Sequence, residues 1–407
     1  MTLAFLGDSL FDTGNLNVLA GAFGIEPFPP PLYSGGKASN GLVLGEAIAA
    51  QLGIDPATID LGFRLLPTFE TNPLEQTVNY AVAGATTDEF GSASNDLEIV
   101  PIGLQSQAQL FSLDLIAAGA VVADAADRPD VLLSAGSNDV LEVLPDIAAL
   151  ADIMFSPDKT DDEALQQELA AQIAGNIEAA IASIDGLVDD IVIAGIPPLG
   201  DIPLARQIDE QVDDLLAGDF AGDTREFLTN TAAAINAQLS LLYDGPSSNP
   251  EAAVDQFSQF LDEPARQFLC GLLSDLSDDL LNHSGAIAEN SWIGNFLNSL
   301  QDALLGTDCA PDPVDNVLVI DAVDIFEAGL QNWQNSLPEA LEPIAELSYR
   351  DYLDQLGSGS PSELPGDLVV DQFAFVDGVH STEGLNIELA KLVAAQITME
   401  FPDFGVG

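Results

Sequence analysis

The chain has 407 residues, of which 47% are hydrophobic, so it can bury a large core and is not a globally disordered protein. Nine basic residues against 66 acidic ones give a formal net charge of −57, which excludes nucleic acid and anionic membrane surfaces as partners because both would be repelled. Such a surface also repels itself, and we expect salt to relieve that repulsion.

Short apolar runs alternate with helical patterns through most of the chain. This alternation predicts an α/β fold in three layers, with a parallel sheet of about five strands and helices on both of its faces. The predicted strands are 3–6, 77–82, 131–134, 191–194 and 317–320, and the clearest predicted helices are 41–53, 104–119, 161–184 and 381–401.

Two stretches, 245–313 and 333–367, interrupt the alternation. Both have largely helical patterns punctuated by proline and glycine, and neither offers a good strand. We therefore predict a single domain, 1–407, that carries two helical insertions. Their apolar residues either pack against each other and the core or form a cap over a binding site.

Two further features bear on the compartment. No run of about 18 apolar residues occurs, and the first residues lack a basic start followed by an apolar segment. We therefore expect no integral membrane segment, in a secreted or extracellular protein whose signal is absent from this sequence; the alternative is the cytoplasm of a high-salt organism. Cys270 and Cys309 are either separate thiols or one disulfide, and the sequence leaves both open.

Ser9 lies in "GDSLFDTGN", directly after the first predicted strand. A serine at that place is either a helix N-cap or a nucleophile. A nucleophilic serine needs a base, and the chain has two histidines. His380 follows Asp377 by three residues, so that in a tight turn the carboxylate can reach Nδ1; the alternative is a surface turn. His283 has no carboxylate at comparable spacing and is interpreted as a surface or lid residue.

Ester hydrolysis also needs donors for a developing oxyanion. Gly84, in "NYAVAGATT", could present an unobstructed N–H after the second predicted strand. Asn138, in "SAGSNDV", could present its side-chain amide after the third. Each has a plainer interpretation, as a glycine turn and as a helix cap. The carboxyl ends of parallel strands are, however, where open sheets bind ligands.

Taken in order, these segments resemble the blocks of the GDSL family, also called SGNH hydrolases. The matching segments are "FLGDSLFDTGN", "NYAVAGATT", "GSND" and "DGVH", together with "AGIPPLGDIP" and "GGKASNGLVLGEAIA", which resemble plant-type and haemolysin-type members. The resemblance spans residues 3–244, 314–332 and 373–398. Lys37 stands where arginine is usual. Val376 stands where tryptophan is frequent and Ser381 where proline is common, and these two departures put the shape of the acyl pocket in doubt.

The resemblance implies a flavodoxin-like α/β/α fold and a set of site residues. Ser9 would be the nucleophile, His380 the general base and then acid, and Asp377 the residue that orients His380. The Ser9 N–H, the Gly84 N–H and the Asn138 amide would form the oxyanion hole.

We therefore predict a carboxylic ester hydrolase that acts through an acyl-serine intermediate on neutral lipid or short-to-medium acyl esters. One alternative is an acyltransferase that uses the same acyl-enzyme; the other is a catalytically idle, cation-dependent surface module. No cofactor and no metal are expected, and solvated loop acids are the default interpretation of Asp308, Asp312 and Asp315. The sequence does not give the oligomeric state.

Overall fold

A computed structural model describes residues 2–30, 32–63, 72–91, 100–120, 127–142, 160–216, 223–243, 317–337, 344, 348–351 and 372–405. The first predicted insertion, 245–313, lies outside the described residues, and so does most of the second. His283, Cys270, Cys309 and the acids Asp308, Asp312 and Asp315 therefore also lie outside them.

The centre of the fold is a six-stranded parallel sheet with the order β2-β3-β1-β4-β5-β6. Its middle strands are buried on both faces, which is why they occur in the sequence as short continuous apolar runs. The strands are β1 (Leu3–Gly7), β2 (Asp60–Leu61), β3 (Val78–Asn79), β4 (Asp130–Ser134), β5 (Ile191–Ala194) and β6 (Val317–Ile320).

The sequence predicts five of these strands and misses β2. This strand has two exposed residues at the edge of the sheet, so no apolar run marks it. The predicted strand 77–82 shortens to the two residues of β3, although the Tyr80 and Val82 N–H groups still donate to the Phe5 and Gly7 carbonyls of β1.

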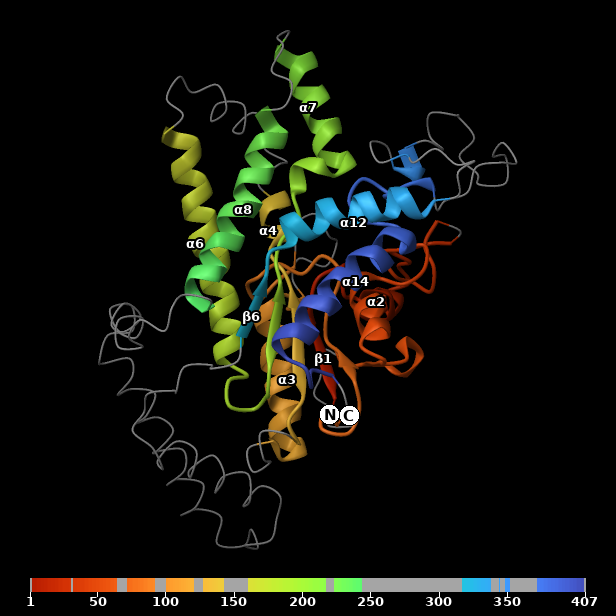
Figure 1. Ribbon diagram of the computed structural model, residues 1–407, viewed down its shortest axis with the longest axis vertical. Coiled ribbons are helices and arrows are strands. Elements are labelled where there is room, and N and C mark those ends of the chain that lie inside the picture. Colours follow the sequence, from red (N-terminus) through yellow and green to blue (C-terminus); the bar gives the residue numbers. More distant parts are fainter. Residues whose placement is uncertain are drawn as a thin grey trace, which may run out of the picture.

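Helices cover both faces of the sheet, as Figure 1 shows. On one side α3 (Leu104–Ala118) packs against β1 and α6 (Thr160–Ala182), and α6 packs against α8 (Asp223–Tyr243). On the other side α14 (Glu383–Glu400) packs against β6, α2 (Leu44–Gln51) and α12 (Ala322–Ser336). The predicted three-layer α/β/α fold is confirmed.

Four further elements lie near the carboxyl ends of the strands. They are α1 (Asn15–Gly21), α4 (Ser137–Glu142), the 3-10 turn η4 (Leu199–Asp201) and α7 (Pro203–Leu216), while the 3-10 turn η1 (Pro56–Thr58) precedes β2. Because α12 extends to Ser336, the first residues of the predicted insertion 333–367 belong to a core helix, in which Trp333 is buried.

Candidate active site

The segment after β1 makes a tight turn that holds Ser9. The Asp8 N–H donates to the Ser134 carbonyl of β4 at 3.1 Å, and the Asp8 carboxylate accepts the Leu10 N–H at 3.0 Å. Gly7 is required at this place, because its φ is +138° and a Cβ there would lie 1.9 Å from the Ser134 carbonyl oxygen. Ser9 is thereby fixed at the carboxyl end of β1, with 9% of its surface exposed.

Asp12 ties this turn to the segment that follows β3. Its buried carboxylate accepts four backbone N–H bonds, which leaves both oxygens occupied. The donors are Gly14, Asn15, Leu16 and Ala83, at 2.6–3.0 Å. Since Ala83 directly precedes Gly84, this one side chain sets the position of the Gly84 turn relative to Ser9.

Gly84 and Asn138 lie in segments that are bonded to each other. Gly84 has a φ of +81°, which favours glycine, and the Asn138 Nδ2 donates to the carbonyl of the neighbouring Ala85 at 2.8 Å. Asp139 strengthens the junction, because its carboxylate accepts both the N–H and the hydroxyl of Thr87. The two predicted oxyanion donors are therefore held in one connected piece of structure.

Asp377 and His380 are in direct contact in the loop before α14. The His380 Nδ1 lies 2.8 Å from Asp377 Oδ2, and Asp377 Oδ1 accepts the backbone N–H groups of Val379 and His380 at 2.9 and 2.8 Å. This arrangement fixes the imidazole so that Nε2 points away from the carboxylate. The loop itself is tied to α7, because the Leu204 N–H donates to the Gly378 carbonyl.

The charges of this pair reinforce each other. Although burial opposes both charged forms, the interaction with His380 and its hydrogen bonds lowers the pKa of Asp377 well below its usual range. Burial of the ring lowers the pKa of His380, but the charge of Asp377, its hydrogen bond and the charge of Asp8 together outweigh burial and raise this pKa. Asp377 therefore stays ionised at neutral pH, where it stabilises a proton on His380.

Asp8 brings the turn after β1 into the same electrostatic field. Burial raises the pKa of Asp8 to about 7, and the nearby His380 partly offsets this increase. Its Oδ2 is buried and has no hydrogen-bond partner among the described residues. The charge of Asp8, the residue before Ser9, in turn helps to raise the pKa of His380.

Sequence reasoning missed Tyr33, which contributes to the site. The Tyr33 hydroxyl donates to Asp377 Oδ2, and its ring packs against Phe28, which in turn lies edge-on to the His380 ring at 5.9 Å. Burial and the Asp377 charge raise the pKa of Tyr33, so its hydroxyl remains a donor. The Arg350 side chain also interacts with that hydroxyl. A buried tyrosine 344 residues from its partner leaves no spacing signal in the sequence.

All five predicted site residues lie along the carboxyl edge of the sheet. Ser9 follows β1 and Asn138 follows β4, which are neighbours in the sheet. The chain adds β3 on one side of β1 and β4 on the other, so this junction is the topological switch point, where open α/β sheets bind ligands.

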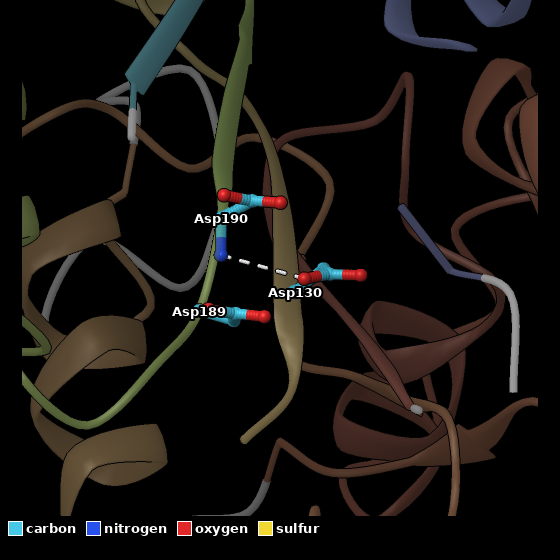
Figure 2. A group of neighbouring side chains, drawn as sticks. All are labelled: Asp130, Asp189 and Asp190. Atoms are coloured by element: carbon cyan, nitrogen blue, oxygen red, sulfur yellow. Dashed lines mark hydrogen bonds between the residues drawn. The ribbon is translucent and has the colours of Figure 1, made fainter. Parts of the chain in front are cut away.

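A separate acidic cluster, formed by Asp130, Asp189 and Asp190, lies at the opposite, amino edge (Figure 2). It is the one group in the described part of the chain whose ligand atoms are close enough to share a metal ion. Two oxygens of Asp130 already accept the backbone N–H groups of Gly405 and Asp190. We assign no ion to this cluster.

No membrane-spanning helix occurs among the described residues.

The chain was compared with curated proteins and with protein families. No curated protein matches the chain. The family described as GDSL-like Lipase/Acylhydrolase matches it over residues 3–393, which is nearly its whole length.

Proposed function

Because the chain belongs to the GDSL-like lipase/acylhydrolase family, we propose that it cleaves carboxylic esters through an acyl-serine intermediate on Ser9. Family membership makes the protein an ester hydrolase in general terms. The substrate class we propose is neutral lipid or short-to-medium acyl esters, because a net charge of −57 disfavours strongly anionic substrates.

The contact between His380 and an ionised Asp377 carries this proposal. With Nδ1 held by the carboxylate, Nε2 of His380 accepts the Ser9 proton while Oγ attacks the ester carbonyl. The protonated imidazole then gives that proton to the leaving alcohol. Water then attacks the acyl-serine, with His380 again acting as base and then as acid, which releases the carboxylic acid and restores the free Ser9 hydroxyl.

The tetrahedral intermediate carries a negative oxygen that needs fixed donors. The Ser9 N–H, the Gly84 N–H and the Asn138 amide supply them in this proposal. The Asn138 Nδ2 donates one of its two hydrogens to the Ala85 carbonyl, and the second hydrogen is left to donate to the oxyanion. The Asp12 and Asp139 bonds hold these donors in place before the substrate arrives.

Hydrolysis of a series of p-nitrophenyl esters by the full chain tests the proposal. We expect Ser9→Ala and His380→Ala to abolish turnover without loss of the fold, and a fluorophosphonate probe to label the wild-type protein but not Ser9→Ala. Matched controls are Ser34→Ala, at an exposed serine, and His283→Ala; both should keep wild-type rates. Full activity in a folded His380→Ala protein would refute the assignment.

A further inference from the structure

An apolar pocket lies between the carboxyl ends of β5 and β6 and the helices α12 and α14. Its volume is about 60 Å³, and all but two of the residues that line it are apolar residues or glycine. The exceptions are Ser134 and Ser381, and the Ser381 hydroxyl is already bonded to Asn386 at 2.5 Å. The pocket therefore offers almost nothing to a polar ligand.

Three residues that line this pocket are sequence neighbours of the proposed catalytic residues. Leu10, which follows Ser9, lines it, as do Val379 and Ser381, the two neighbours of His380. Leu10 and Val379 are both partly exposed, and so are Ala322 and Ile325 of α12. The lining is therefore partly open to solvent at these four side chains, which distinguishes the pocket from a closed gap in the core.

We propose that this pocket binds the alkyl part of the acyl group while it is attached to Ser9. This inference rests on the proposed function and narrows its substrate class. A cavity needs about 10–15 Å³ to hold one water, so a pocket of about 60 Å³ has room for several water-sized groups. A methylene is close to that size, and the pocket therefore fits a short, unbranched acyl chain.

The fixed surroundings of the pocket explain why the chain length would have an upper limit. Its floor is built from core strands and helices, with Ile320, Phe326 and Phe375 all buried. The Phe326 and Phe375 rings lie 6.3 Å apart and pack together, so they cannot move aside without a loss of core packing. A longer acyl chain would have to leave part of its length outside.

Kinetics on p-nitrophenyl esters from acetyl to decanoyl test the proposal with the full chain. For wild type we expect kcat/KM to rise by about fourfold per methylene and to stop rising near hexanoyl, because each buried methylene contributes a similar increment until the pocket is full. Ala322→Phe should fill the pocket, lower kcat/KM for the hexanoyl ester at least tenfold, and change the acetyl ester less than threefold.

Two further variants make the result specific. Ala328→Phe is the matched control, because it adds the same side chain to the exposed face of the same helix, and its profile should equal that of wild type. Ile325→Ala, which enlarges the pocket at its partly exposed rim, should move the optimum to longer esters.

The possible failures are distinguishable. An unchanged chain-length profile in folded Ala322→Phe and Ile325→Ala proteins that still hydrolyse esters would overturn the pocket and leave the proposed function intact. A wild-type protein that hydrolyses no ester and does not react with the fluorophosphonate probe would overturn the proposed function itself.

Discussion

Replacement of Tyr33 by phenylalanine removes one hydrogen-bond donor from Asp377 and leaves the ring packing in place. Asp377 otherwise keeps three donors: the N–H groups of Val379 and His380 on Oδ1, and the His380 ring. A hydrogen bond to a charged group contributes about 1.5–3 kcal/mol, and about 1.4 kcal/mol corresponds to a factor of ten in rate. Because Oδ1 stays anchored, we expect the lower end of that range, a fall in kcat of about tenfold.

The pH profile separates a positioning role from simple destabilisation. Without the Tyr33 hydroxyl, more negative charge on Asp377 faces the imidazole, so the pKa of His380 should rise further. The general base must be neutral, and the rising limb of kcat/KM against pH should therefore move to higher pH. Tyr243→Phe is the matched control, since its buried hydroxyl has no partner among the described residues. A Tyr33→Phe protein with wild-type kcat and an unshifted profile would refute the reasoning.

Three other outcomes can be checked on the purified protein. Asn138→Ala should lower kcat by about 10²–10³, the usual loss for one oxyanion donor; a change only in KM would contradict that role. Burial raises the pKa of Asp130 to about 7, so this group should lower the stability of the wild-type protein as the pH rises from about 4 to 7. In urea unfolding, Asp130→Asn should remove up to about 3 kcal/mol of the loss over this pH range, and an identical pH slope in both proteins would exclude this source. A net charge of −57 predicts that Tm rises with salt, most steeply below about 0.1 M, whereas a Tm independent of salt would mean that the carboxylates are already compensated.

Much of the sheet could be predicted because its strands are buried. The strands β1, β4, β5 and β6 occur as continuous apolar runs, and their alternation with helices indicates that they are parallel. By contrast β2 could not be predicted, since a two-residue exposed edge strand is defined by its neighbour β3 and not by its own residues.

The same distinction between local and distant partners applies to the site. Contact between Asp377 and His380 follows from a separation of three residues, and the sequence could indicate it. The bond from Tyr33 to Asp377 and the bond from Ala83 to Asp12 join residues that are 344 and 71 positions apart. No periodicity or spacing encodes such pairs, because only the completed sheet brings them together.

These distant bonds have a consequence for how the site is formed. Ser9, Gly84, Asn138 and His380 follow different strands or precede the last helix, and the segment that carries each is bonded to another segment. Asp12 fixes the Gly84 turn, Asn138 reaches the Ala85 carbonyl, and α7 holds the loop of His380 through Gly378. The donors and the base can therefore reach their positions only after the whole sheet and the last helix have assembled, so esterase activity should disappear together with the sheet as the protein unfolds.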